Sequence, residues 1–209
     1  TTTSLLLQFV TVISGFIVPR IIIGTYGSDV NGLTASITQF LGYIALFEAG
    51  VGGVVRAAMY KPLAHKDMTK LSGIVRATES FFRKIALIFV GYMLVLAAAF
   101  PVLVNNSFDW MFTASLVVII GISTFAQYYF GMTYTVLLYA DQRRYVTSYL
   151  QIFTIILNAV LVVIFAKLGA SIHWLKLGTA AVYVLRPIIL NWYVKRGYKL
   201  DKKAKPDTQ

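Results

Sequence analysis

The stretch 148-SYLQIFTIILNAVLVVIFAKL-168 contains one charged residue, Lys167. An α-helix rises about 1.5 Å per residue, so about 20 apolar residues cross the roughly 30 Å hydrocarbon layer of a bilayer. Arg143 and Arg144 precede this stretch, whereas the connection after it, residues 169–171, has no Lys or Arg. The stretch therefore predicts a membrane-spanning helix with one basic flank.

Further apolar stretches of similar length occur along the chain. The six predicted spans are Ser4–Gly24, Leu33–Val55, Phe81–Val104, Trp110–Leu138, Ser148–Leu168 and Ile172–Tyr193. The chain of 209 residues is 58% hydrophobic and 14% aromatic, a composition too apolar for a domain that is dissolved in water. The predicted fold is an all-α membrane protein, a bundle of six transmembrane helices over residues 1–198, followed by a polar cytoplasmic tail or inter-lobe linker at residues 199–209.

Lys and Arg are concentrated in alternate connections. The basic ones are residues 56–84, residues 143–144 and the tail, whereas the turns 25–32, 105–109 and 169–171 contain Asp29 and Asp109 and no Lys or Arg. The positive-inside bias places the basic connections, and therefore both termini, in the cytoplasm. Within the first connection, Met68, Leu71 and Val75 recur at helical spacing. This predicts an amphipathic helix that either lies on the inner leaflet or is solvated and joins two spans.

Composition excludes several classes of function. The chain has a net charge of +11, but its basic residues are separated by six apolar spans. This distribution argues against nucleic-acid binding and favours contact with anionic headgroups. The chain has no cysteine, and His65 and His173 are far apart in sequence, so neither a disulfide, a metal site nor a cofactor is expected. Neither a paired-carboxylate motif nor a His–Asp acyltransfer motif is present, and no enzymatic activity is expected.

Two ionisable residues fall inside predicted spans. Glu48 lies in the second span and Arg186 at a similar depth in the sixth. A charged group facing lipid at such a depth costs about 2.5–3.5 kcal/mol on insertion scales. The two side chains either pair with each other, or Glu48 is solvated from the cytoplasm while Arg186 extends to the inner headgroups. Glu48 is thus a candidate for ion coupling or for helix pairing.

Polar side chains form stripes on the last three predicted spans. At 100° per residue they fall on one face of each helix, which is typical either of a hydrated cavity or of interhelical hydrogen bonding. The candidate cavity-lining residues are Gln127, Tyr134, Gln151, Asn158, Thr179 and Tyr183.

Three basic residues are candidates for binding an anion inside the membrane. Arg20 follows Pro19 in the outer part of the first span, and Lys176 and Arg186 lie on the polar face of the sixth. Guanidinium and ammonium groups bind phosphate through charge-assisted hydrogen bonds, so the expected cargo carries a phosphate or pyrophosphate. For Arg20 the alternative is simple extension to the headgroups.

Three segments carry a family resemblance. In Phe16–Ile23, Tyr26–Leu33 and Leu46–Gly52, an Arg near the end of the first helix is followed by a Tyr-Gly turn and by an acidic-small-Gly segment in the second helix. With Tyr60–Leu63 and the amphipathic connection, this order resembles the polysaccharide flippases of the multidrug/oligosaccharidyl-lipid/polysaccharide exporter superfamily. Members of that family have two six-helix lobes around a central cavity, and this chain is similar to the amino-terminal lobe. We therefore expect the chain to be a fragment.

The resemblance implies a function and a set of partners. It implies alternating-access transport of a polyprenyl-pyrophosphate-linked oligosaccharide, such as an O-antigen or lipopolysaccharide precursor, across the bacterial cytoplasmic membrane. The implied partners are the lipid bilayer, the lipid-linked oligosaccharide, the carboxy-terminal lobe and the polysaccharide polymerase machinery. Within the resemblance, Arg20 corresponds to a basic cavity residue and Glu48 to the acidic position of the second helix.

Two alternatives remain open at this point. A multidrug/ion antiporter of the same superfamily would need a cavity rich in carboxylates, and Glu48 is the one carboxylate expected among the spans. A non-transporting membrane assembly protein would need no cavity.

Overall fold

The computed structural model describes residues 2–103, 108–198 and 200, without the side chains of residues 47–49, 101 and 103. Every regular element in these residues is a helix. The elements are α1 (Thr2–Tyr26), α2 (Ser28–Gly42), α3 (Ala45–Ala64), α4 (Met68–Leu103), α5 (Trp110–Ala126), the π-helical turn η1 (Gln127–Gly131), α6 (Met132–Ala140), α7 (Arg144–Lys167) and α8 (Ile172–Gly197). The prediction of an all-helical fold is confirmed for the described residues.

Among the described residues, five helices are long and apolar enough to cross a membrane. They are Thr2–Tyr26, Met68–Phe100, Trp110–Ala140, Arg144–Lys167 and Ile172–Gly197. They correspond to the first, third, fourth, fifth and sixth predicted spans. The chain thus has the helices of a multi-pass membrane protein.

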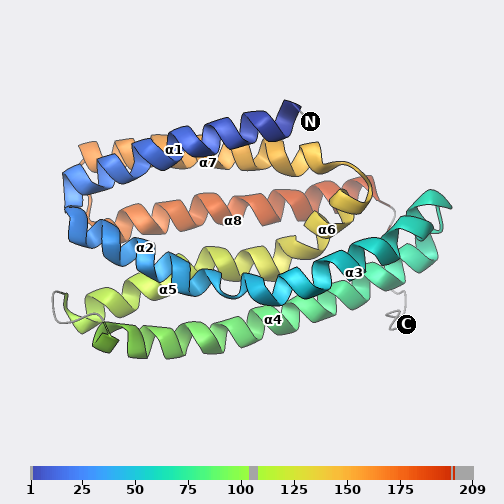
Figure 1. Cartoon of the computed structure of the whole chain (residues 1–209), viewed down its shortest axis with the longest axis horizontal. Coiled ribbons are helices and arrows are strands. Elements are labelled where there is room, and N and C mark those ends of the chain that lie inside the picture. Colours follow the sequence, from blue (N-terminus) through green and yellow to red (C-terminus); the bar gives the residue numbers. More distant parts are fainter. Residues whose placement is uncertain (1, 104–107, 199, 201–209) are drawn as a thin grey trace.

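The second predicted span, Leu33–Val55, is divided between α2 and α3. The helical ladder breaks at Tyr43, whose backbone N–H donates to the Phe40 carbonyl at 3.2 Å, and the Leu46 N–H donates to the Tyr43 carbonyl at 3.1 Å. Each of these bonds joins residues i and i+3, as in a 3₁₀-helix, instead of i and i+4. Such bonds tighten one turn and interrupt an α-helix. Gly42, the last residue of α2, favours such an end because glycine is a weak helix former. α2 and α3 still run end to end beside the other helices (Figure 1).

α4 continues the predicted amphipathic segment directly into the third span. It is one helix of 36 residues, and Figure 1 shows it as a single, gently curved rod. Its first part packs against α3 as an antiparallel hairpin. Of the two interpretations of the amphipathic segment, this arrangement favours the one in which it joins two spans. It disfavours the one in which the segment lies flat on the leaflet.

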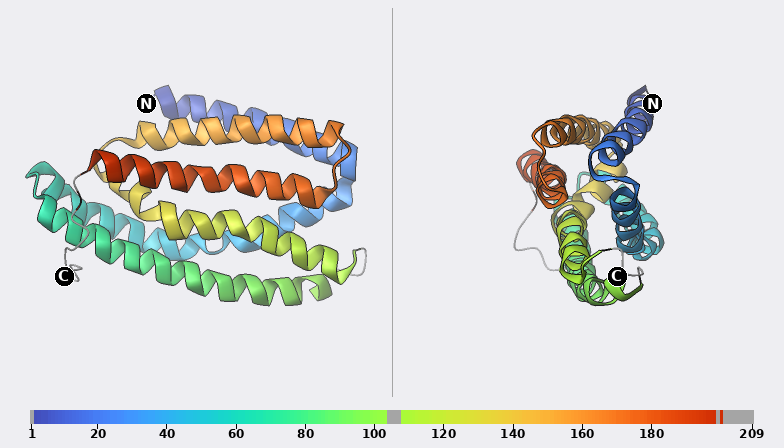
Figure 2. Two further views of the ribbon diagram at one scale, coloured as in Figure 1. Left: turned by 180° about the vertical axis from the view of Figure 1, so that it is seen from behind. Right: turned by 90° about the vertical axis from the view of Figure 1, so that its left-hand side faces the viewer.

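The helices form two layers. In one layer α7, α8, α5 and α4 lie side by side in that order, each packing along the next. The other layer consists of α1, which packs along α7, and of α2–α3, which packs on α5, α4 and α6 (Figure 2). α1 and α3 are connected through α2 and diverge toward the other end of the bundle (Figure 1).

Within the described residues, the chain turns bring the basic α3–α4 and α6–α7 connections to one end (Figure 1). The α3–α4 turn, the α6–α7 turn, the start of α1 and the end of α8 lie together there, and we call this the basic end (Figure 1). The α1–α2 and α7–α8 turns lie at the opposite end, which we call the neutral end. There the Tyr26 hydroxyl donates to the Ala170 carbonyl at 2.7 Å and ties α1 to the α7–α8 turn.

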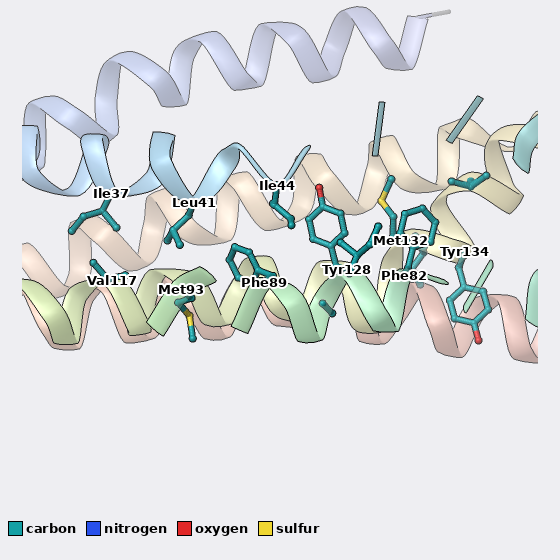
Figure 3. Close-up of a cluster of buried hydrophobic side chains, with 14 of the residues drawn as sticks. Ile37, Leu41, Ile44, Phe82, Phe89, Met93, Val117, Tyr128, Met132 and Tyr134 are labelled. Carbon is teal, nitrogen blue, oxygen red and sulfur yellow. The ribbon is translucent and has the colours of Figure 1, made fainter. Parts of the chain in front are cut away.

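The core lies between the two layers. Ile37 and Leu41 of α2 face Phe89 and Met93 of α4 and Val117 of α5 (Figure 3). Toward the basic end the same core continues through residues such as Phe82 and Tyr128. These side chains hold α2–α3 against α4–α5.

The outer surface of the bundle is also apolar. Leu5, Phe9 and Phe16 of α1 are 69%, 65% and 75% exposed, and Ile156 and Val160 of α7 are about half exposed. A water-soluble protein rarely leaves apolar patches of this extent uncovered. The exposed surface is therefore suited to lipid or to a further apolar partner.

A close helix contact in this bundle depends on Gly131 in η1. A Cβ atom at this position would lie 2.7 Å from the Pro187 Cβ of α8, whereas a Cβ at Gly91 of α4 would meet nothing within 4 Å. We expect Gly131→Ala to lower thermal stability by several degrees, since overpacking costs about 1–3 kcal/mol. Gly91→Ala is the matched control and should leave the midpoint within a degree or raise it. Equal midpoints for the two variants would contradict the close contact.

Candidate arginine cluster at the basic end

Two arginines from different helices lie against one tyrosine ring, and a third arginine interacts electrostatically with the same tyrosine. The guanidinium carbon of Arg56 (α3) lies 5.5 Å from the ring centre of Tyr139 (α6), and that of Arg144 (α7) lies 5.1 Å from it. The Arg186 guanidinium of α8 is within electrostatic reach of the Tyr139 and Tyr183 hydroxyls. We call Arg56, Tyr139, Arg144 and Arg186 the arginine cluster.

The packing of α6 explains this convergence. α6 is the short helix at the basic end that contacts α3, α7 and α8, so Tyr139, in its last turn, sits where the ends of those helices meet. The aromatic ring attracts each guanidinium through its negative face. This allows positive charges from different helices to approach one another.

None of the cluster's arginines takes part in an ion pair within the described part of the chain. The described ion pairs are Glu79–Arg83 at 3.8 Å and Asp141–Arg143 at 2.9 Å. The Arg56 Nε atom is buried and has no hydrogen-bond partner in the structure. Because a buried donor without a partner is costly, this arrangement is suited to an anion that would accept from these guanidinium groups.

The predicted basic residues fall at two levels of the bundle. Arg20 of α1 is exposed and Lys176 of α8 is half-buried, and both lie toward the neutral end. Arg186 lies ten residues further along α8 than Lys176, which is about 15 Å at the helical rise. The structure therefore brings Arg186 to the arginine cluster and leaves Arg20 and Lys176 nearer the opposite end.

The polar stripe of α8 joins these levels. Thr179, Tyr183 and Arg186 are spaced i, i+4 and i+7, so they share one face of the helix. The Thr179 hydroxyl is buried without a described partner, as is the side-chain oxygen of Asn158 on the neighbouring α7. Gln151 is half-buried on α7, and Gln127 lies in η1 beside the close contact of Gly131 with Pro187.

Tyr134 lies in a different environment. Its hydroxyl donates to Glu79 of α4, whose carboxylate also pairs with Arg83. These residues line a pocket of about 270 Å³ together with Lys195 and Tyr198. Tyr134 thus belongs to the α4–α6 contact. The side chain of Glu48 is outside the described part of the structure, so its pairing with Arg186 remains a prediction.

A second carboxylate holds the end of α8. The Tyr198 hydroxyl donates to Asp141 in the α6–α7 turn, and Arg143 pairs with the same carboxylate. Burial raises the pKa of Tyr198, and the hydrogen bond to Asp141 raises it further. The phenol therefore stays protonated and remains a donor, which fixes the α6–α7 turn beside the arginine cluster.

The described residues contain no group of three or more His, Cys, Asp or Glu side chains that could hold a metal ion. The arrangement offers donors and positive charge. Chemically it is suited to binding an anion.

Comparison of the chain with protein-family models, with curated proteins and with solved structures finds no match.

Sequence reasoning missed most of the arginine cluster. Arg56 and Arg144 were assigned to basic connections, and Tyr139 was not singled out. The available signal was their position, since all three lie within a turn or two of a basic connection, where helix ends from the same side of a membrane meet.

The Tyr139 ring is expected to offset repulsion among the three arginines. We expect Tyr139→Leu to lower stability by about 1–2 kcal/mol at low salt, because each cation–π contact contributes about 0.5–1 kcal/mol. Added salt should recover part of this loss, since the Debye length falls to about 3 Å at 1 M. Thermal unfolding at two salt concentrations measures both effects.

Tyr129→Leu is the matched control. The Tyr129 ring faces Arg83 at 5.4 Å, and the charge of Arg83 is already balanced by Glu79. The loss of stability caused by Tyr129→Leu should therefore not depend on salt. The same salt dependence in both variants would show that Tyr139 does not separate unpaired charges.

Proposed function

We propose that the chain is one lobe of a flippase that moves a polyprenyl-pyrophosphate-linked oligosaccharide across the bacterial cytoplasmic membrane by alternating access. The observation that carries the proposal is the placement of Arg56 and Arg144 against Tyr139, with Arg186 in electrostatic interaction with the same tyrosine and no described carboxylate partner for any of the three. Pyrophosphate offers several acceptor oxygens and more than one negative charge. Guanidinium side chains bind such phosphate oxygens through charge-assisted and often bidentate hydrogen bonds.

In this proposal α2 and α3 together form a second span, which gives six spans with both termini in the cytoplasm. The basic end faces the inner leaflet, as the positive-inside bias requires. The arginine cluster then receives the pyrophosphate from the inner leaflet, and Lys176 and Arg20 provide positive charge nearer the outer leaflet. Binding and movement of the lipid involve no catalytic step by this chain.

The exposed face of α1 favours the presence of a second lobe in the proposed transporter. Of the α1 side chains described, Ile22 alone is buried. Alternating access requires two bodies around one site, and an apolar helix face at the edge of the bundle is suited to packing against the second body. In the proposal that body is the carboxy-terminal lobe, which residues 1–209 need for transport.

The two described carboxylates that form ion pairs argue against the alternative of a cation-exporting antiporter. Glu79 is occupied by Tyr134 and Arg83, and Asp141 by Tyr198 and Arg143. Neither is free to bind a cationic drug. The unpaired charges of the described cluster are positive, which favours an anionic cargo.

The orientation can be tested with single cysteines, because the sequence contains none. We expect a membrane-impermeant maleimide to label Ser28→Cys and Ser171→Cys in intact cells, since both lie at the neutral end. Gln142→Cys, in the α6–α7 turn, should react after permeabilisation alone. Labelling of Gln142→Cys in intact cells would reverse the proposed orientation.

The anion site can be tested by binding. In phosphatidylcholine nanodiscs, the protein should bind farnesyl pyrophosphate far more tightly than farnesol. Arg56→Gln, Arg144→Gln and Arg186→Gln should each weaken this binding about tenfold or more, because a hydrogen bond to a charged group contributes about 1.5–3 kcal/mol. Arg→Lys should retain part of it. Arg196→Gln is the control, since Arg196 lies at the same end with its guanidinium 5.3 Å from the Trp192 ring.

Equal binding by the three cluster variants, the control and the parent protein would remove the arginine cluster from the site. Transport by purified residues 1–209 in liposomes without a second lobe would contradict the two-lobe proposal.

A further inference from the structure

A groove lies between α3 and α4 at the basic end, and none of the arginine-cluster residues lines it. Its volume is about 720 Å³, which is within the range of pockets that hold small ligands. The α3–α4 hairpin extends past the ends of α7 and α8 (Figures 1 and 2). The groove therefore runs from the bundle toward the protruding turn.

The lining changes from apolar to basic along the groove. Val51 of α3 and Phe81 of α4 line the part within the bundle, whereas Lys61 and Lys70 line the part near the turn. Ten residues separate Val51 from Lys61, which is about 15 Å along the helix. This length and polarity match a molecule with an apolar body and an anionic head.

The middle of the groove offers space and little polarity. Ala57 and Ala58 line it with small side chains. The Thr78 hydroxyl, on the facing wall, donates to the Ile74 carbonyl of its own helix at 2.7 Å, so its proton is already used. An alkyl chain fits this part better than a polar group does.

The rim of the groove carries positive charge. Lys61 and Lys70 are exposed, and neither takes part in an ion pair among the described residues. Asp67 also lines the groove, but its carboxylate accepts from the Lys70 backbone N–H at 3.0 Å and so caps the start of α4. His65 adds an imidazole. Two lysines are thus available to an anionic head.

We infer that this groove binds one anionic glycerophospholipid. An acyl chain lies along Val51, Ala58 and Phe81, and the phosphate lies between Lys61 and Lys70. The site is where membrane-crossing helices leave the hydrocarbon and where headgroups lie, and each Lys near an anionic lipid surface contributes about a factor of five in affinity. A free phosphate would leave the apolar part of the groove unfilled.

The chain's own tail fits the groove poorly. Residues 201–209, DKKAKPDTQ, have Ala204 and Pro206 as their non-polar side chains and bring three more lysines. Such a segment would neither fill the apolar part nor neutralise the basic rim.

Native mass spectrometry of residues 1–209 released from detergent tests the inference. Phosphatidylglycerol should bind as one retained molecule in preference to phosphatidylcholine with the same acyl chains, and glycerol phosphate should bind far more weakly. The Lys61→Gln/Lys70→Gln variant should weaken phosphatidylglycerol binding about 25-fold, at about fivefold for each lysine. Ala58→Phe keeps both charges and fills the groove, and it should also displace the lipid.

The matched control is Lys66→Gln/Lys84→Gln, which removes the same charge from exposed positions that do not line the groove, and it should bind phosphatidylglycerol like the parent. Equal binding of the two phospholipids, or equal loss in both double variants, would overturn the inference. Glycerol phosphate binding as tightly as the lipid would show an anion site without a lipid chain. If Ala58→Phe does not fold, the comparison of Lys61→Gln/Lys70→Gln with Lys66→Gln/Lys84→Gln still tests whether the groove binds the lipid.

Discussion

Hydrocarbon offers no hydrogen-bond partner to a peptide group, and the other features of this structure depend on that constraint. Each span must satisfy its own backbone, so the described regular structure is helical throughout. Because lipid is as apolar as the core, the helices can leave large side chains such as Phe16 bare on the outside. What distinguishes one face from another is then the placement of the few polar and charged groups.

Those groups are sorted along the bundle. Two carboxylates are each held by a tyrosine and an arginine, Glu79 by Tyr134 and Arg83 and Asp141 by Tyr198 and Arg143. The arginines gathered around Tyr139 have no such partner in the described structure. In our proposals the arginine cluster receives an anion from the inner leaflet, and the lysines of the α3–α4 groove receive an anionic headgroup. The same end of the molecule would then combine two different ways of binding phosphate.

The sequence predicted the spans well where composition alone sets them. Ser148–Leu168 became α7 (Arg144–Lys167) and Ile172–Tyr193 became α8 (Ile172–Gly197), because a long and predominantly apolar stretch predicts a helix of that length. The break at Tyr43 and the π-helical turn were not predicted. Both are local changes of hydrogen bonding inside apolar runs whose composition does not change. Arg186 was a candidate for anion binding from the sequence, but Arg56 and Arg144 were not, because residues from three helices come near one another there through tertiary packing.

The central claim is that the arginine cluster contacts the pyrophosphate of a prenyl lipid. Solid-state NMR of ¹⁵N-arginine protein in bilayers, with dephasing of the guanidinium signals by ³¹P of a bound prenyl pyrophosphate, measures this contact directly. Signals assigned to Arg56, Arg144 and Arg186 should lose intensity as expected for direct nitrogen–phosphate hydrogen bonds, which bring the heavy atoms to about 2.7–2.9 Å. Undiminished signals from these three residues, with the lipid bound elsewhere, would contradict the account.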